Sequence, residues 1–441
     1  MPMEAISTEL TRDMLVAAGV LVAAYALIFT EVLHRATAAL LGAVLMVVAG
    51  MAFGFYDQES AIRAIDGNTM VLLLAMMMMI AILRPTGAFE YAAVRITKLA
   101  RGDARVLLVY LALAVSLISM ILDNVTTIII FAPLTVLITR LLKLNPMPFL
   151  IAEAMMSNIG GAATLVGDPP NIMIGSAGNI DFTRFLVHMG PPIAVVWIGT
   201  MALLLFLFRN HLRVRLSGEV ELDERKAIKD PLALAIALGA LALIVVLFFV
   251  HHLLHLYPAF VALVGLVLAM LLLRSQPDKL FSEVHWSVLI FFAALFVIVG
   301  GVESSGLLDL VGGQLADMAR DPEKLLLACL ALMWVAAVLS AVVDNIPFTV
   351  AMIPIIVGLE KAGLDIAPLW WALAIGVGLG GNGTHIGATA NIIAVSESEK
   401  TGDPRGRITP MAWLRVGIPT MVVSLVLASA VYALFFDYFR G

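Results

Sequence analysis

Cysteine and charged residues are both scarce in this sequence. The chain has one cysteine among 441 residues, and only 13% of its residues are charged. A single thiol excludes a disulfide framework and any metal site built from several thiolates of one chain. The low charge, beside 61% hydrophobic residues and a mean hydropathy of +1.02, excludes an ordinary soluble domain. The composition therefore predicts an all-α polytopic membrane protein.

Apolar runs long enough to cross a bilayer, or nearly so, follow one another along the chain. The first run, Met14–Thr30, lacks a basic flank and a small-residue cleavage site, so we expect it to be the first span. Two long runs, at 147–177 and 367–395, are interrupted by glycine, proline and polar residues. Charged linkers are expected at 84–105, 209–230, 303–324 and 396–415.

Two motifs occur twice, and the second copies follow the first at a nearly constant offset. "DNVTTIIIFAP" begins at Asp123 and matches "DNIPFTVAMIP", which begins at Asp344. "GGAATLVGDPPNI" begins at Gly160 and matches "GGNGTHIGATANI", which begins at Gly380. The shared order and spacing predict that the chain consists of two homologous halves.

The charges predict how the halves are oriented. We interpret each Asp-Asn motif as the tip of a re-entrant helical hairpin, which leaves five true crossings in each half and makes the second half inverted. Placing 84–105 in the cytoplasm then puts 20 of the 27 Lys and Arg residues on the cytoplasmic side. The expected fold is two inverted repeats, 1–208 and 231–441, joined by a cytoplasmic linker at 209–230. Each repeat has five transmembrane helices, one hairpin and one broken helix, and both termini lie outside. If the hairpin arms crossed the membrane separately, the inversion would be lost.

The stretch "SNIGGAATLVGDPPNI", residues 157–172, interrupts a membrane helix at mid-depth. Non-helical backbone cannot face lipid, so it must be buried in protein or line a wet cavity. The exposed ends of the two half-helices offer amides to anions and carbonyls to cations. Two such breaks at matching places in inverted halves indicate the transport site of a secondary transporter.

Carboxylates inside a membrane are costly and are by default functional. Asp123 and Asp344 stand at the hairpin tips, and Asp168 lies in the first break. In the second break Ala388 replaces Asp168, and His385 is the titratable group instead. We expect Asp123 or Asp344 to carry the coupling proton, and we favour Asp344 because its break has no carboxylate of its own. The alternative is that each Asp-Asn pair only caps the helix that follows.

Other groups complete the candidate site. Asp168 and Glu153 are further candidates for proton coupling, although Asp168 before two prolines could be a turn former and His385 a packed side chain. "HHLLH", starting at His251, has zinc-like spacing but no third ligand nearby, so we expect no metal site. The expected neutral ligands and donors are Asn124, Thr126, Asn158, Gly161, Thr164, Asn171, Asn345, Asn382, Thr384 and Asn391.

The first hairpin motif, "DNVTTIIIFAP", and the first break, "GGAATLVGDPPNI", resemble those of the ion-transporter superfamily. The similarity is to the branch that holds ArsB-type arsenite permeases, NhaD-type sodium/proton antiporters and melanosomal P proteins, and it runs from about residue 36 to 436. It implies a scaffold domain and a transport domain, a homodimer and an elevator-like motion. Dicarboxylate carriers of the superfamily have Ser-Asn-Thr at the hairpin tips. The Asp-Asn pairs here depart from that pattern and favour a proton-coupled site.

The expected function is a proton-coupled efflux antiporter in the plasma (inner) membrane, with arsenite and antimonite as the first substrates. With one cysteine, arsenite would bind as its neutral trihydroxide through oxygen and amide groups. The alternatives are a sodium/proton antiporter with Asp and carbonyl oxygens around Na⁺, and an organic anion transporter. An intramembrane hydrolase and a passive channel are disfavoured, so we expect no enzyme and no cofactor beyond the coupling ion. The expected partners are the lipid bilayer and a second copy, with a cytoplasmic ATPase subunit as a weaker candidate and no nucleic acid.

Overall fold

The computed structural model describes residues 10–30, 32–213, 227–308, 310, 324–342, 345–361, 364–400 and 406–440. Within these ranges every regular element is a helix and there is no strand. Eight of the described helices are long and apolar enough to cross a membrane. The predicted all-α membrane fold is therefore confirmed.

The first half contributes ten α-helices and one short 3₁₀ helix. They are α1 (Arg12–Thr30), α2 (Arg35–Phe53), α3 (Gln58–Arg63), α4 (Gly67–Leu83), η1 (Arg84–Thr86), α5 (Ala88–Leu99), α6 (Ala104–Ser119), α7 (Asn124–Leu141), α8 (Met147–Gly161), α9 (Pro169–Ala177) and α10 (Phe182–Leu207).

The described helices of the second half follow the same order. They are α11 (Pro231–Val250), α12 (Pro258–Leu273), α13 (Pro277–Glu283), α14 (Trp286–Ser304), α16 (Leu325–Val342), α17 (Asn345–Lys361), α18 (Ala367–Gly380), α19 (Thr389–Lys400), α20 (Pro410–Leu434) and α21 (Phe436–Arg440).

The packing of the helices repeats between the halves. Helix α6 packs on α8 as α16 packs on α18, and α1 packs on α2 as α11 packs on α12. Contacts between the halves come in matching pairs too, because α4 packs on α12 and α14 on α2, while α9 packs on α17 and α19 on α7. Each half-helix that follows a break therefore lies against a hairpin helix of the other half. The inversion of the halves across a membrane remains a prediction.

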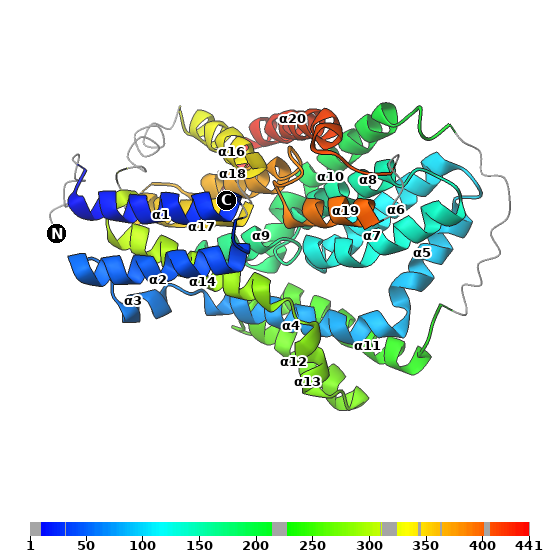
Figure 1. The fold of residues 1–441 in the computed structure, drawn as a ribbon, viewed down its shortest axis with the longest axis horizontal. Coiled ribbons are helices and arrows are strands. Elements are labelled where there is room, and N and C mark those ends of the chain that lie inside the picture. Colours follow the sequence, from blue (N-terminus) through cyan, green and yellow to red (C-terminus); the bar gives the residue numbers. More distant parts are fainter. Residues whose placement is uncertain are drawn as a thin grey trace.

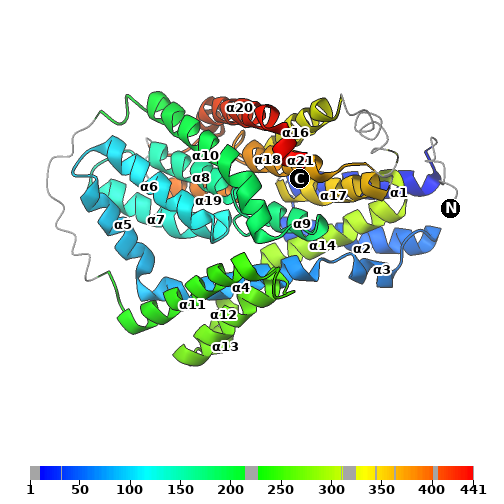
Figure 2. The ribbon, with the colours of Figure 1, turned by 180° about the vertical axis from the view of Figure 1, so that it is seen from behind.

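The helices lie mostly along the long axis of the molecule (Figure 1). Helices α1, α2 and α14 form one end, and α5 to α8 form the other, with α9 between them. Helices α11 to α13 lie along one side with α4, as the view from behind also shows (Figure 2). The break between α8 and α9 is buried throughout, whereas the break between α18 and α19 is partly exposed, with Ile386 39% exposed.

Glycines allow the broken helices to approach their neighbours. A Cβ atom on Gly160 of α8 would collide with the carbonyl oxygen of Ser116 in α6. A Cβ atom on Gly380 of α18 would collide with the carbonyl oxygen of Ala337 in α16. Small residues at such positions let membrane helices pack backbone to backbone, so the repeated Gly-Gly motif serves packing in both halves.

One expectation about the linkers was wrong. Residues 84–105 were expected to be a charged linker, but they form η1 and the two-sided helix α5. Phe89 and Ala93 of α5 are buried, and Phe89 packs edge-to-face on Phe131 of α7 with ring centroids 6.2 Å apart. Helix α5 carries charged residues on one face and buried apolar residues on the other. The charged residues made 84–105 look like a polar linker, so the helix was not predicted.

Candidate functional site

The first break is closed by side chains bonded to its own backbone. Asn171 of α9 donates from Nδ2 to the carbonyl oxygens of Gly161, at 3.1 Å, and Thr164, at 2.8 Å. Thr164 donates its hydroxyl hydrogen to the carbonyl of Met120 and accepts from the backbone N–H of Gly167. Three of the predicted ligands, Gly161, Thr164 and Asn171, therefore hold the shape of the break.

The second break uses the same bonds at the matching positions of the second half. Asn391 donates from Nδ2 to the carbonyl oxygens of Gly381, at 2.7 Å, and Thr384, at 2.9 Å. The Thr384 hydroxyl donates to the carbonyl of Ala341, which is the counterpart of Met120. The structural repeat therefore extends to individual hydrogen bonds.

Four buried asparagines, drawn from both halves, meet beside the second break. Asn158 of α8 donates from Nδ2 to Oδ1 of Asn382, at 2.9 Å, and to Oδ1 of Asn391, at 3.0 Å. Asn124, at the start of α7, donates to Oδ1 of Asn158 at 3.2 Å. Nδ2 of Asn382 is buried and has no partner among the described residues. We call Asn124, Asn158, Asn382 and Asn391 the amide cluster; it has no net charge, and its Asn382 NH₂ group donates no hydrogen bond to the described residues.

The mirror position beside the first break lacks these amides. The repeat counterparts of Asn158 and Asn382 are Gly378 and Ala162. Where a Cβ atom on Gly378 would stand, the Cβ of Ala162 lies 2.9 Å away, so small side chains fill this place. Asn171 Oδ1 is buried and has no partner in the described part of the chain, because no amide stands opposite it.

A carboxylate distinguishes the first break. Asp168 is 1% exposed, and Asn345 of α17 in the other half donates from Nδ2 to both of its oxygens, at 3.3 and 3.1 Å. Asp168 occupies the N-cap position of α9 but makes no side-chain cap bond. Pro169 and Pro170 have no N–H to offer at the first two helical positions. The Asp168 carboxylate therefore does not cap α9 and is bonded to α17 of the other half.

Asp123 is used differently. One of its carboxylate oxygens accepts from the backbone N–H of Thr126 at 2.9 Å, and the other accepts from the Thr126 hydroxyl at 2.6 Å. Asp123 is thus an N-cap of α7, as the capping alternative predicted. Asp344 lies outside the described residues, and its proton-carrying role stays a prediction.

The hairpin tips reach the breaks in two ways. The backbone N–H of Asn124 donates to the carbonyl of Gly167, at 3.2 Å, so the first tip meets the break of its own half. The side chain of Asn345 reaches Asp168 instead, which belongs to the break of the other half. The second tip therefore contacts the break of the other half. This contact could not be predicted from the order of the motifs within one half.

Two other predicted groups have a buried atom without a partner among the described residues. Glu153 of α8 is 1% exposed, accepts from the Thr135 hydroxyl through Oε1, and has no described partner for Oε2. His385 lies half-buried in the second break, and its Nδ1 has no partner among the described residues. Neither side chain is hydrogen-bonded to the amide cluster or to Asp168.

Sequence reasoning missed one cation at the second break. Arg35, at the start of α2, donates to the hydroxyl of Thr389, at 3.1 Å, and Thr389 is the first residue of α19. Thr389 and Ala390 keep their backbone N–H groups, whereas the counterparts in α9 are prolines. No motif pointed to Arg35, because its contact with Thr389 spans 354 residues.

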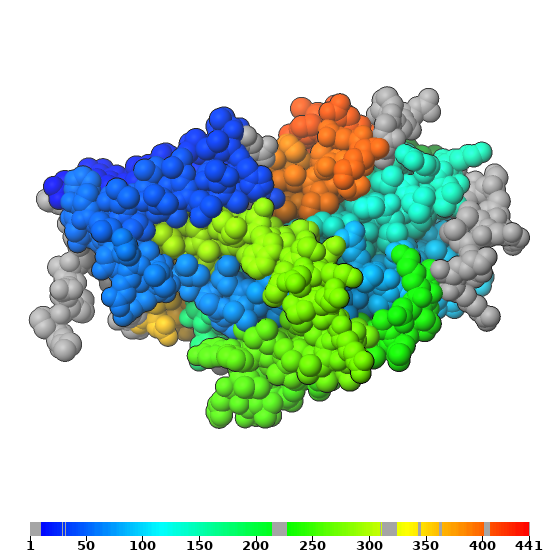
Figure 3. Space-filling view, turned by 60° about the horizontal axis from the view of Figure 1, so that its bottom comes forward, coloured from blue at the N-terminus to red at the C-terminus, as the bar shows by residue number. Residues whose placement is uncertain are grey.

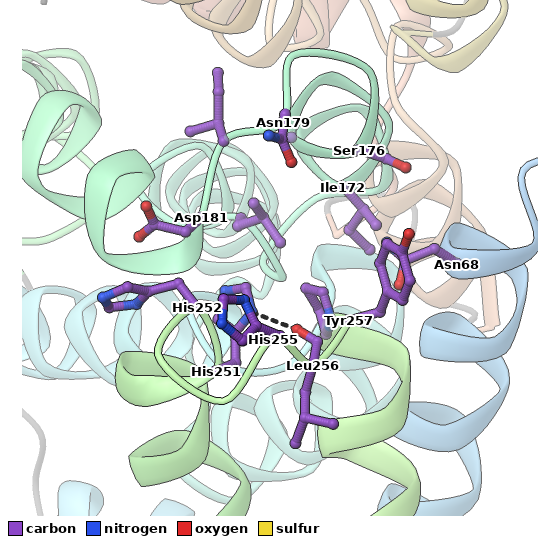
Figure 4. A pocket seen from close by; sticks show the side chains of 14 residues that line it. Asn68, Ile172, Ser176, Asn179, Asp181, His251, His252, His255, Leu256 and Tyr257 are labelled. Carbon is purple, nitrogen blue, oxygen red and sulfur yellow. Dashed lines mark hydrogen bonds between the residues drawn. The ribbon is translucent and has the colours of Figure 1, made fainter.

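A pocket of about 430 Å³ adjoins the first break (Figure 4). Leu165 and Ile172 of the break region line it, and His252 and His255 of the α11–α12 loop stand on another side. His251 accepts from the backbone N–H of Phe182 at 3.3 Å, and its other ring nitrogen lies 2.8 Å from the carbonyl of Leu256. Both ring nitrogens of His251, the first histidine of "HHLLH", therefore have backbone partners, at Phe182 and Leu256.

A family model for citrate transporters, CitMHS, matches residues 25–376. The chain belongs to the CitMHS family. This CitMHS member is 36% identical to a 46 kDa membrane protein of Mycobacterium leprae, over 94% of this chain and 96% of the other. It is 37% identical to an uncharacterised transporter of Mycobacterium tuberculosis, over 96% and 99% of the two chains. It is a membrane transport protein and not an enzyme.

Two further similarities bear on the prediction. The P protein of Homo sapiens is 32% identical over 93% of this CitMHS member, which spans 58% of that longer protein. The predicted resemblance to the P protein branch is therefore confirmed. The crystal structure of the Alcanivorax borkumensis YdaH transporter has the same fold, with a TM-score of 0.59, 15% identity, and coverage of 97% of this chain and 99% of that one.

Proposed function

We propose that this CitMHS member is a proton-coupled secondary active transporter whose two breaks divide the work. The first break binds the coupling proton, and the second receives the solute. The observation that carries the proposal is the buried carboxylate of Asp168, which makes no cap bond and is held by Asn345 of the opposite half.

A proton on Asp168 would change a contact between the halves. The ionised carboxylate accepts two hydrogen bonds from the Asn345 amide, whereas the protonated acid offers one acceptor fewer and adds a donor. Loading and unloading the proton therefore alters how the first break is held against α17. This gives a physical link between protonation and movement, which the capping carboxylate of Asp123 does not offer.

For the solute we propose arsenite, bound as the neutral trihydroxide. The amide cluster is uncharged, and its unused Asn382 Nδ2 supplies a hydrogen-bond donor. Cys329 is fully buried in α16, and no thiolate cage can be built from one cysteine. Oxygen and amide hydrogen bonds are thus the chemistry that the second break offers to such a solute.

A carboxylate such as citrate is the second candidate. Arg35 beside Thr389 and the N–H groups at the start of α19 favour an anion at the second break. The description of the family as citrate transporters points the same way. A third candidate, Na⁺ exchanged for protons, would use the Asp168 carboxylate and the unpartnered Asn171 Oδ1 as hard oxygen ligands.

The assembly follows from the resemblance. We propose a homodimer in the plasma membrane, with both termini outside, in which a transport domain moves against a scaffold. Labelling of single cysteines in a Cys329→Ala protein tests the orientation. Labelling of position 215 from outside the cell would contradict the inverted topology.

Transport into everted vesicles tests the proposed function. An imposed pH gradient is discharged by arsenite, citrate or Na⁺ added one at a time, and the solute that dissipates the gradient identifies the substrate. Wild-type protein and Asp168→Asn are compared, with reconstituted protein-free vesicles as the blank. If wild-type protein moves one of these solutes without any dependence on the pH gradient, proton coupling is contradicted.

A further inference from the structure

A second cavity lies beside the last residues of the linker between the halves, and none of its lining residues belongs to either break. It has a volume of about 980 Å³ and is lined by η1, the residues before α11, and the turn from α12 to α13. The backbone N–H of Lys229 donates to the carbonyl of Thr86 at 2.9 Å. Gly87 lies so close to the carbonyl of Ala227 that a Cβ atom would collide with it. These contacts fix the end of the linker, so the cavity has defined walls. We call it the linker cleft.

The charges of the linker cleft do not cancel. Arg84 lies 3.6 Å from Glu283, and Lys229 lies 3.3 Å from Glu90. The third acidic residue, Asp230, accepts from the N–H of Ala233 and caps α11. Two further cations line the cleft, namely Arg274, which ends α12 in the left-handed conformation, and Lys279 of α13.

The Arg274 and Lys279 side chains have no hydrogen bond or ion pair within the described ranges. Ser275, Gln276 and Ser282 add hydroxyl and amide groups to the same wall. A cavity that presents two unpaired cations together with neutral donors suits a phosphate group.

The surroundings of the cleft favour a phosphate that belongs to a lipid. Helices α11 and α12 project from the body of the molecule with α13, on the face that Figure 3 brings forward. In α11 only 22% of the span is buried inside the protein. Leu232 at its start is 70% exposed, and Leu271 near the end of α12 is 71% exposed. Trp286, which follows α13, is 46% exposed and donates its indole N–H to the carbonyl of Phe281, as suits a membrane interface.

We infer that the linker cleft binds the headgroup phosphate of an anionic phospholipid, with Arg274 and Lys279 as its ligands and the acyl chains along the exposed leucines of α11 and α12. The site differs from the transport site and does not depend on the proposed substrate. It would connect three segments through one lipid, namely the η1 turn, the end of the linker and the α12–α13 turn. The anionic leaflet on the cytoplasmic side supplies such a lipid.

Native mass spectrometry of the full chain, with phosphatidylglycerol or phosphatidylcholine added in detergent, tests the inference. We expect phosphatidylglycerol to be retained preferentially. The double variant Arg274→Gln/Lys279→Gln should weaken its binding about 30-fold. The charge-conserving Arg274→Lys/Lys279→Arg should restore most of it. The matched control is Arg101→Gln/Arg105→Gln, which removes the same charge from exposed positions outside the cleft and should leave binding unchanged.

Three results would overturn the inference. The first is equal retention of the two lipids, and the second is an equal loss in the cleft variant and the control. The third concerns the source of the phosphate. If inorganic phosphate at millimolar concentration displaces phosphatidylglycerol from the wild-type protein, the cleft binds a soluble anion and not a lipid.

Discussion

The two breaks have the same backbone and different chemistry. Both are tied by an asparagine amide that donates to two carbonyls, and both threonine hydroxyls donate to an equivalent carbonyl of the preceding hairpin. The first break adds a buried carboxylate and two prolines, whereas the second adds alanine, threonine and a nearby arginine. The two halves thus keep the bonds that hold the shape of each break, while other residues of the breaks differ between them. This difference is the reason why we propose a proton or a cation at the first break and a neutral or anionic solute at the second.

The largest expected effect comes from the carboxylate that only the first break has. Asp168→Asn keeps the size and the polarity of the side chain but cannot titrate. Proton-driven transport should fall by far more than the tenfold that the loss of one neutral hydrogen bond would explain. The measurement is discharge of a pH gradient in reconstituted vesicles, with solute binding measured separately.

Asp123→Asn is the matched control, because asparagine caps a helix about as well as aspartate. Its transport should stay within a few-fold of wild type. Near-normal pH-driven transport by Asp168→Asn would contradict the proposal that the first break binds the coupling proton. Loss of pH-driven transport in Asp123→Asn but not in Asp168→Asn would indicate that Asp123, at the hairpin tip, binds the coupling proton.

The next effect separates the two solutes proposed for the second break. Arg35→Gln removes the cation beside Thr389. If the solute is a carboxylate, its uptake should fall about tenfold or more, since a hydrogen bond to a charged group is worth about 1.5–3 kcal/mol. Transport of neutral arsenite should change by less than a few-fold. Competition by citrate and by arsenite in the same vesicles distinguishes the cases, and equal loss for both solutes would show a structural role for Arg35.

A smaller effect compares the two asparagines that tie the breaks. Both donate to two carbonyls, but only Asn391 also accepts a hydrogen bond, from Asn158. Asn391→Ala should therefore lower the free energy of unfolding more than Asn171→Ala, by about 0.5–1.5 kcal/mol. Denaturant unfolding in detergent micelles measures the difference. A greater loss in Asn171→Ala would mean that its unpartnered Oδ1 has a partner in the working protein.

The last comparison, between the threonines of the two breaks, should show no difference in the free energy of unfolding. The hydroxyls of Thr164 and Thr384 make equivalent bonds, to Met120 and to Ala341. Thr164→Val and Thr384→Val should each lower the free energy of unfolding by about 0.6 kcal/mol, the average for such bonds between membrane helices. The same unfolding measurement applies. Unequal losses would show that the threonines differ in function although their bonds are alike.

Much of this protein was predictable from its sequence, because the relevant signals are local or periodic. The apolar runs predicted membrane helices, the glycines and prolines predicted both breaks, and the constant offset between the repeated motifs predicted the matching halves. The candidate list also contained all four members of the amide cluster and Asp168. The amphipathic helix α5 was missed, since its charged side dominated the composition of 84–105.

What the sequence left open was decided by contacts between residues far apart in the chain. Both Asp123 and Asp168 lie among apolar residues in the sequence. In the structure Asp123 caps α7, whereas Asp168 accepts a hydrogen bond from Asn345, 177 residues away. Arg35 reaches Thr389 and Asn158 reaches Asn382 across similarly long separations. A sequence determines which groups each half-helix carries, because hydrophobicity and backbone freedom act over a few residues. Only the packing of one half against the other determines which of those groups face each other, and therefore that Asp168 joins the two halves, whereas the cap bond of Asp123 to Thr126 is local.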